Sequence, residues 1–300
     1  MIAPLSRTAL RSRWTVQRLA RRADELQVPE GGTCRRHGDR AVARGDAPVR
    51  VMGIVFDSPL ILAAGLDRHG QLLRHGAVLG LGAVETGSHW TRAARPQHAV
   101  AHAGERGEVG RLLLAGGSLR GALHGLSLAK PPALDWAEAG EAYWRAVRAW
   151  HGSADYVVLN PGRGDPSAAR FADLVAALSA RCARLVRRRR LALVVKLPAS
   201  WVEADDRVAM ARRFVAAGAD GLLLSAEGGV DRACGRIAEL SRALGPGVGL
   251  ISVGGIDSVR EARARLRAGA HLVQVHRAAL RNGKPGPDLL ARIAALRSQG

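Results

Sequence analysis

Eight short apolar segments alternate with helical patterns between residues 60 and 277, and this alternation constrains the fold more than any other feature. Their near-continuous apolar character is typical of parallel strands that helices cover. The expected strands span residues 60–66, 83–88, 125–130, 155–160, 192–198, 221–226, 249–255 and 272–277. Amphipathic segments, which we expect to be helices, lie among them at residues 138–150, 168–188, 205–217 and 258–268. Eight alternations within one domain predict an α/β fold of the (β/α)8 TIM barrel type.

The first 48 residues differ from the rest, and we expect them to form an N-terminal helical extension and a linker. Leu10, Trp14, Val16, Leu19 and Leu26 are spaced among arginines as in an amphipathic helix. Such a helix either lies on a membrane surface or packs against its own domain, and we favour packing. The part from residue 28 to 48 is rich in Gly, Arg and Asp without an apolar period, which is typical of a linker. The barrel domain is expected to occupy residues 49–300.

Composition bounds the class of protein. The chain has 300 residues, 47% of them hydrophobic and 24% charged, as in soluble globular proteins. A formal charge of +19 would suit nucleic-acid binding, but almost all of it comes from dispersed arginines, which indicates a coding bias instead. We therefore expect no nucleic-acid partner. The three cysteines lie far apart without metal-ligand spacing, so we expect reduced thiols, no bound metal and a cytoplasmic location. The alternative location is a peripheral one, on the inner face of the membrane.

Polar residues recur where the expected strands end. In barrels of this type, chemistry takes place at the carboxyl ends of the strands. The residues found there are Asp67, Arg68, Ser88, Ser127, Lys130, Asn160, Lys196, Ser225, Glu227, Gly254, Gly255, His276 and Arg277. Most have a simple alternative explanation, because any strand that leaves a core becomes polar. Lys196 is different, since it lies within an apolar strand where an unpaired ammonium is costly to bury. It predicts an anionic or electron-rich partner.

The last two expected strands end in a pattern typical of a phosphate site. Gly254 and Gly255 follow the seventh strand, where backbone N–H groups can approach an anion without obstruction by a Cβ atom. His276 and Arg277 follow the eighth strand, before an expected helical turn. Many barrels bind phosphate with these two loops. The alternative is a glycine-rich turn that only closes the barrel.

Together these motifs resemble the dihydroorotate dehydrogenases, and among them the membrane-associated, quinone-linked class. The resemblance runs in order from about residue 49 to residue 293. It rests on the stretches VRVMGIVFDSPLILAAGLDRHG, GAVLGLGAVETGS, ADYVVLN, VVKLP and SVGGIDSVREARARLRAGAHLVQV. It implies a barrel that contains FMN and dehydrogenates a cyclic amide acid. It also implies that the N-terminal helices form a hydrophobic access route for a quinone.

The positions that the resemblance assigns to FMN largely persist. Ala63, Ala64 and Gly65 match the backbone segment under the flavin ring, and Ser88 matches a hydroxyl residue near it. Lys196 matches a lysine at the N1 and O2 edge of the ring, where positive charge stabilises the reduced flavin. The other cofactor positions are Arg68 in place of a lysine, Ser127 in place of an asparagine, Asn160, Ser225, Gly254, Gly255, His276 and Arg277.

The substrate side departs from the family. The loop after the fourth strand reads NPGRGDP, with no Ser or Cys before Ser167, although the family places the catalytic serine of the quinone-linked class there. The asparagines that hold the cyclic amide acid are mostly replaced, which would leave that ring's polar groups unpaired. Asp165, or else Glu227, is then the candidate proton-transfer group, and Arg163 is the candidate for binding an anionic substrate. The alternative for Asp165 is a turn or helix-capping role.

Three functions remain at this stage. The first is an FMN-dependent oxidoreductase that acts on a small, anionic substrate other than dihydroorotate, with Asp165, Arg163 and Lys196 as its catalytic residues and a quinone or another electron acceptor as its partner. The second is a non-catalytic barrel that binds phosphate or flavin, or serves as a scaffold. The third is an enzyme like tRNA dihydrouridine synthase, disfavoured because Arg163 stands where that family has its cysteine. A homo-oligomer or a partner subunit is compatible with all three.

Overall fold

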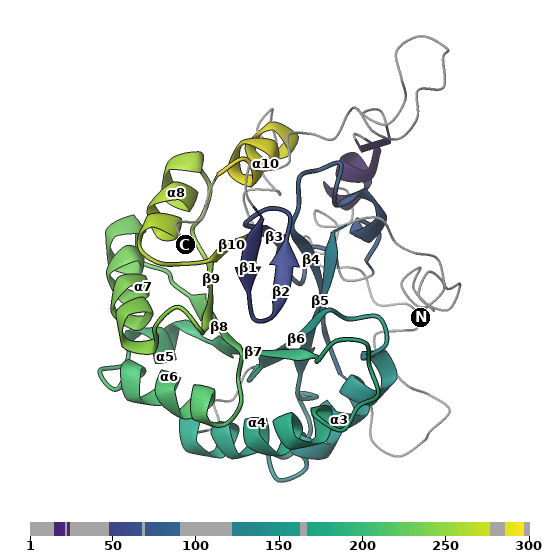
Figure 1. Cartoon of the computed structure of the whole chain (residues 1–300), viewed down its shortest axis with the longest axis vertical. Coiled ribbons are helices and arrows are strands. Elements are labelled where there is room, and N and C mark those ends of the chain that lie inside the picture. The colour runs from purple at the N-terminus through teal and green to yellow at the C-terminus, as the bar shows by residue number, and fades with distance from the viewer. Residues whose placement is uncertain are drawn as a thin grey trace.

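A closed barrel of eight parallel strands forms the centre of the protein (Figure 1). The computed structural model describes residues 15–21, 23–24, 48–67, 70–90, 122–162, 167–276 and 286–296. The barrel strands are β3 (Leu60–Leu62), β4 (Ala83–His89), β5 (Leu123–Ala129), β6 (Tyr156–Asn160), β7 (Ala192–Leu197), β8 (Gly221–Ser225), β9 (Gly249–Val253) and β10 (Leu272–Val275). Each pairs with the next in parallel, and β10 pairs with β3 to close the ring. All eight predicted strands and the predicted fold class are confirmed.

Helices surround the barrel on its outside, as Figure 1 shows. They are η1 (Leu73–His75), α3 (Ala139–Trp150), α4 (Ala168–Cys182), α5 (Ala199–Glu203), α6 (Arg207–Ala216), α7 (Val230–Leu244), α8 (Val259–Arg267) and α10 (Gly286–Ala294). The four predicted helices are present, but α4 ends six residues before the predicted end at residue 188. Beyond α4 the chain turns back, and Arg187 donates from Nη2 to the carbonyl of Ala154 at 2.6 Å.

A β-hairpin closes the amino-terminal end of the barrel. Its strands are β1 (Val49–Val51) and β2 (Ile54–Phe56), which lie across the centre of the ring in Figure 1. Met52 and Gly53 both have positive φ, as a two-residue type I′ turn requires. A Cβ atom on Gly221 or on Gly249 would lie 2.5 Å from the Met52 side chain. The absence of side chains at these two strand starts therefore makes room for the hairpin.

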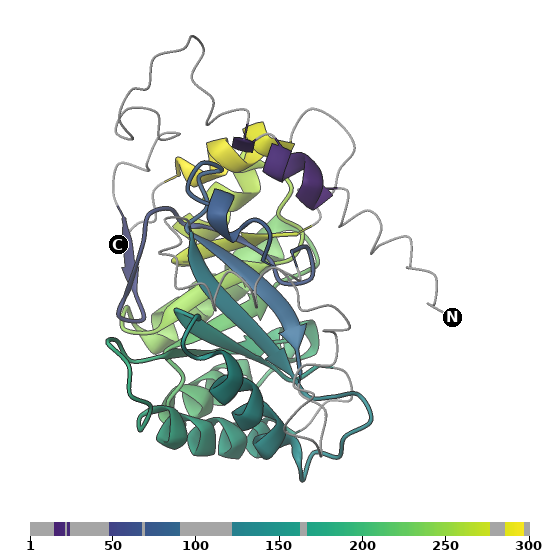
Figure 2. The ribbon, with the colours of Figure 1, turned by 90° about the vertical axis from the view of Figure 1, so that its right-hand side faces the viewer.

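The described part of the N-terminal extension packs on the barrel. Residues 15–21 and 23–24 are helical, and Val16, Leu19 and Ala23 are buried in a cluster with Leu290 and Ile293 of α10. Figure 2 shows this purple helix beside the yellow α10. The prediction that an N-terminal amphipathic helix packs against its own domain is confirmed for these residues. The other apolar positions of the predicted helix and most of the predicted linker lie outside the described residues. No helix in the described part of the chain is both long and apolar enough to span a bilayer.

Candidate active site

Strand alternation brings the predicted site residues to the inside of the barrel. One buried cluster draws residues from seven of the eight barrel strands and from the β1–β2 hairpin, and Leu123 of β5 packs against it, so the cluster lies inside the ring. Ile61, Ala83, Val194 and Leu223 belong to it. Successive strand residues point to opposite faces, so steps of two along each strand stay on the inner face. Such steps toward the carboxyl ends reach Ala63, Glu85, Ser127, Asn160, Lys196, Ser225 and Gln274. One end of the interior is therefore polar and the other is apolar.

Ser88, Ser127 and Asn160 form one hydrogen-bonded cluster at the carboxyl ends of β4, β5 and β6. The Ser88 and Ser127 hydroxyls are 2.9 Å apart, and the Asn160 Nδ2 donates to Ser88 Oγ at 3.1 Å. The Asn160 carbonyl accepts from the Tyr143 hydroxyl at 2.5 Å, and its side-chain oxygen accepts from the N–H of Gly162 at 3.1 Å. Asn160 is thus held at both its backbone and its side chain. The structure brings these three predicted residues together.

A bulge in β4 turns Ser88 toward this cluster. The pairing of β4 with β5 shifts register between Thr86 and His89, so three steps on β4 match two on β5. Strict alternation would have placed Gly87, not Ser88, on the inner face. Gly87 has φ of +114°, and a Cβ atom there would lie 2.4 Å from the carbonyl oxygen of Ser127. Only glycine fits this close approach.

A buried carboxyl lies deeper in the barrel. Glu85 is 1% exposed, and the Tyr156 hydroxyl donates to its Oε1 at 3.0 Å. Burial raises the pKa of Glu85 to about 7, although the neighbouring Gln274 amide, the Tyr156 hydroxyl, the charge of Lys196 and the N–H of Ala64 oppose the rise. Burial and the nearby Glu85 carboxylate raise the pKa of Tyr156 well above its usual value. Both groups are therefore protonated below neutral pH.

The Glu85–Tyr156 contact depends on a glycine in the neighbouring strand. Gly125 faces both side chains from β5. A Cβ atom there would lie 2.4 Å from Tyr156 Cζ, 2.5 Å from its hydroxyl oxygen and 2.6 Å from Glu85 Cγ. These distances are far below van der Waals contact, so any larger residue would displace the pair.

Lys196 is the cation of the barrel interior. It lies near the carboxyl end of β7 and is partly buried. Burial lowers the pKa of Lys196, while the carboxylates of Glu85 and Glu227 act in the opposite direction. Among the described residues, no acceptor lies within hydrogen-bonding distance of its ammonium. A lysine on a barrel strand is costly to bury without a partner, and the electron-rich partner expected for Lys196 stays a prediction.

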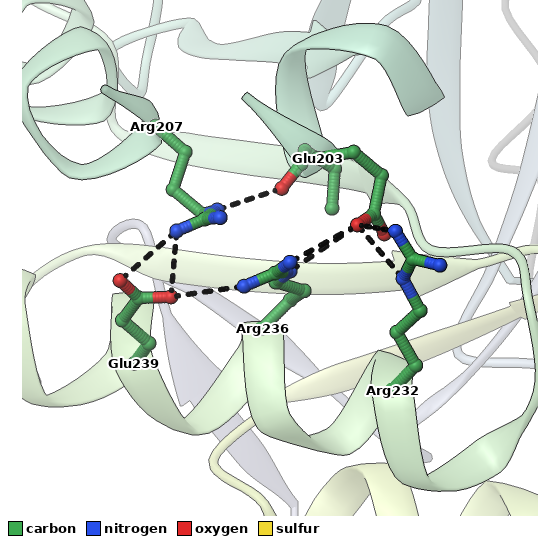
Figure 3. Close-up of polar contacts among 6 residues, drawn as sticks. Glu203, Arg207, Arg232, Arg236 and Glu239 are labelled. Atoms are coloured by element: carbon green, nitrogen blue, oxygen red, sulfur yellow. Dashed lines mark hydrogen bonds and ion pairs between the residues drawn. The ribbon is translucent and has the colours of Figure 1, made fainter. Parts of the chain in front are cut away.

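An ion-pair network joins the helices that follow β7 and β8 (Figure 3). Glu203, at the end of α5, accepts from Arg232 at 2.6 Å and from Arg236 at 3.2 Å, both on α7. Arg207 of α6 donates to Glu239 of α7 at 3.2 Å and to the backbone carbonyl of Val202 at 2.9 Å. Helix α5 follows Lys196 along the chain, and α7 follows Glu227. The network therefore holds the helices that follow these two residues against each other.

Gly254 and Gly255, one of the two predicted phosphate loops, lie against the loop after β8 at the carboxyl ends of the strands. Gly254 and Gly255 follow β9 with φ of +98° and +65°. A Cβ atom on Gly254 would lie 3.2 Å from the carbonyl oxygen of Ala226 and 3.2 Å from Glu227 Cγ, so the loops after β8 and β9 touch. No described residue accepts a hydrogen bond from the N–H of Gly255 or of Glu227. As far as the described residues go, two backbone donors at this edge have no acceptor of their own.

The β3 and β10 ends complete this edge. The N–H of Ala63 donates to the carbonyl of Val275 at 3.0 Å. A Cβ atom on Gly65 would be 3.8 Å from His276 Nε2, so His276 lies beside the Ala63–Gly65 segment. Ser225 lies at the end of β8, between Lys196 on β7 and Gly254 after β9 in strand order. The Ala63–Gly65 segment, Ser225 and His276 thus lie at the same end of the barrel.

Four predicted site residues lie outside the described residues. They are Arg68, Arg163, Asp165 and Arg277. Their roles stay predictions, and so does the expected helical turn after the last strand.

Four further residues were not predicted. Glu85, Tyr156 and Gln274 form the buried polar group inside the barrel, and Arg265 of α8 lies beneath the β8 and β9 ends. Glu85 is a charged residue within an apolar strand, which is the same sequence signal that singled out Lys196. Arg265 had no such signal, because it is one of many arginines on amphipathic helices.

Comparison with known proteins assigns the chain to a family. No protein-family model matches it. A dihydroorotate dehydrogenase (quinone) of Alkalilimnicola ehrlichii is 30% identical over 285 residues, which is 77% of this chain and 81% of that protein. A second, of Leifsonia xyli, is 29% identical and covers 84% of this chain and 86% of its own length. A crystal structure of DHODH from Eimeria tenella in complex with ferulenol has the same fold, with a TM-score of 0.69 at 18% identity over 94% of this chain and 89% of that one. The chain belongs to the dihydroorotate dehydrogenase family.

Proposed function

We propose that the chain is an FMN-dependent oxidoreductase that acts on a small, anionic substrate different from dihydroorotate. The observation that carries this proposal is the joint placement, around one end of a single barrel, of Lys196, the Ser88–Ser127–Asn160 cluster and two backbone N–H groups without an acceptor among the described residues. A phosphate donor set and a partly buried cation on the same rim suit a ligand that has both a phosphate and an electron-rich ring.

The residues present fit FMN at two points. The N–H groups of Gly255 and Glu227, which have no acceptor in the described part of the chain, are suited to its phosphate because anions satisfy such donors. The Lys196 ammonium has no acceptor among the described residues, and an electron-rich ring edge would supply one. When bound, FMN would supply hydride acceptance or donation at N5.

The chain's own residues would orient the ring and balance its charge. Lys196 would place a positive charge beside the ring edge, and Glu85 beneath it is neutral below about pH 7. Because a neutral Glu85 carries no negative charge to offset that of Lys196, the positive charge of Lys196 would favour an anionic reduced flavin. Asn160, held at both ends, would present a fixed polar edge through the serine cluster.

The substrate side supports a changed substrate. Ser127 stands where the resemblance expects an asparagine, and the Asn- and Thr-rich turn of the family is replaced by the segment that begins with Ser225, Ala226 and Glu227. Ala226 is fully buried and offers no side-chain hydrogen bond. A site that lacks these amides leaves the polar edges of orotate unpaired. In this proposal Asp165 manages the proton, with Glu227 as the second candidate, and Arg163 binds the substrate anion.

The electron acceptor is a further part of the proposal. The curated relatives are named for a quinone. The helix at residues 15–24 lies over the barrel beside α10, where an N-terminal access route for a quinone would lie. A cytoplasmic protein with peripheral membrane contact through residues 1–26 would be consistent with this acceptor.

A non-catalytic barrel is the second candidate, favoured by the absence of a Ser or Cys between Asn160 and Ser167. A visible spectrum of the purified protein, with and without added FMN, separates the two in part. Flavin absorption supports the oxidoreductase proposal, and a colourless protein that takes up no FMN refutes it. Dihydroorotate is then added to the flavin-loaded protein without oxygen. Slow or absent bleaching supports a changed substrate, while bleaching at the rate of a relative measured alongside refutes the change.

A further inference from the structure

Arg265 is a buried arginine whose contacts converge on the loops after β8 and β9, the second of which is a predicted phosphate loop. It lies on the inner side of α8 and is 1% exposed. Its Nη1 donates to Ser252 Oγ at 2.8 Å and to the carbonyl of Ala226 at 3.2 Å, and its Nη2 donates to the carbonyl of Gly254 at 2.6 Å. One guanidinium thus binds the strand end of β9 and the loops after both β8 and β9.

The charge of Arg265 is poorly compensated in the described residues. No carboxylate accepts a hydrogen bond from it there, and its Nε has no partner. Glu261, one turn earlier on α8, uses its carboxylate for the helix start instead, accepting from the N–H of Asp257 at 2.9 Å and from the Ser258 hydroxyl at 3.3 Å. Burial lowers the pKa of Arg265, while the nearby Cys234 and Glu261 side chains act in the opposite direction. A buried cation in this state is stabilised by an anion nearby.

The bound carbonyls determine where two N–H groups point. In a trans peptide the C=O and the N–H of the same unit point in opposite directions. The carbonyls of Gly254 and Ala226 point to Arg265, so the N–H groups of Gly255 and Glu227 point away from it. These are the two donors that have no acceptor among the described residues. Arg265 therefore holds both peptide units in the orientation that turns these two N–H groups away from it.

We propose that Arg265 is a positioning residue for a phosphate-type anion at the ends of β8 and β9. It fixes the Gly254–Gly255 and Ala226–Glu227 peptides with their N–H groups turned outward, and it adds a positive charge beneath them. This inference rests on the proposed function, in which the anion is the phosphate of FMN. Free inorganic phosphate has the same chemistry and is the other source.

The test compares FMN with riboflavin, which has the same ring but lacks the phosphate. Dissociation constants of both flavins are measured by fluorescence quenching for the native chain, Arg265→Gln, Arg265→Lys and Arg263→Gln. Arg263 is the matched control, because it is exposed on the same helix and loses the same charge. For Arg265→Gln we expect FMN affinity to fall about 10- to 100-fold, as for lost charge-assisted hydrogen bonds, with riboflavin affinity nearly unchanged. Arg265→Lys should fall between, and Arg263→Gln should match the native chain.

The possible results distinguish failure of the role of Arg265 from failure of FMN binding. If Arg265→Gln folds and keeps the native preference for FMN over riboflavin, the inference is overturned. If Arg265→Gln does not fold, Arg265→Lys decides: a several-fold loss of the preference supports the inference, and an unchanged preference overturns it. If the native chain binds neither flavin, the proposed function fails, and inorganic phosphate becomes the probe. Phosphate should then raise the melting temperature of the native chain and of Arg263→Gln more than that of Arg265→Lys, and equal shifts overturn the inference.

Discussion

Replacing Glu85 by glutamine removes a carboxyl that the fold keeps protonated near neutral pH, and we expect the change to alter how stability depends on pH. The pKa of Glu85 rises from 4.5 to about 7 on folding. A raised pKa means that the folded state binds the proton more tightly, so this contribution is fully present below the unfolded pKa and is lost as pH rises through 7. Between pH 5 and pH 8 the native chain should lose about 2 to 3 kcal/mol through this group alone.

Glutamine keeps the size of Glu85 and an oxygen for the Tyr156 hydroxyl, but it cannot ionise. Urea unfolding of both proteins, followed by tryptophan fluorescence at pH 5, 6, 7 and 8, gives the two stability curves. From pH 5 to pH 8, the unfolding free energy of Glu85→Gln should rise by about 2 to 3 kcal/mol relative to that of the native chain. Parallel curves would show that Glu85 is not protonated in the folded state, and the electrostatic description of the barrel interior would be wrong.

Three further changes test other parts of the structure. Gly125→Ala should lower the unfolding free energy by about 1 to 3 kcal/mol, because its Cβ would overlap Tyr156 and Glu85. Gly140→Ala on α3 is the control: nothing lies within 4 Å of its Cβ, so it should stabilise the protein by a few tenths to about 1 kcal/mol. Equal effects of the two changes in thermal melts would contradict the close approach at Gly125. Lys196→Ala should weaken FMN binding and lower the reduction potential of the bound flavin, measured by redox titration, and native values would refute the role of Lys196. The Arg232 hydrogen bond lowers the pKa of Glu203, so Glu203→Gln should reduce the unfolding free energy by up to about 1 kcal/mol at pH 7. This loss of stability should shrink as pH falls through the lowered pKa of Glu203. A loss that persists at low pH would contradict the ion-pair network.

The sequence sufficed to predict the barrel because parallel strands carry a strong local signal. Each strand is an apolar run bounded by polar residues, and alternation then fixes which residues point inward. Ser127, Asn160 and Lys196 follow that rule directly. Ser88 does not, because the β4 bulge that turns it inward arises from pairing with β5 and from the space beside Gly87.

The buried polar contacts could not be predicted in the same way. The Tyr156 hydroxyl reaches Glu85 across 71 residues of sequence, and the contact depends on the missing Cβ of Gly125 on a third strand. Arg265 meets Ala226 across 39 residues. Such contacts follow from the closed ring, which brings distant strands together, and not from any local pattern around the residues themselves.

Whether this barrel binds FMN is decided by titrating the purified protein with the flavin. Flavin fluorescence and the visible spectrum are followed as protein is added. We expect saturable binding of one FMN per chain, a shifted flavin spectrum and clearly weaker binding of riboflavin, because the phosphate loops contribute to affinity. If the fluorescence and spectrum of FMN stay unchanged at every protein concentration, the barrel does not bind FMN and the proposed function is wrong.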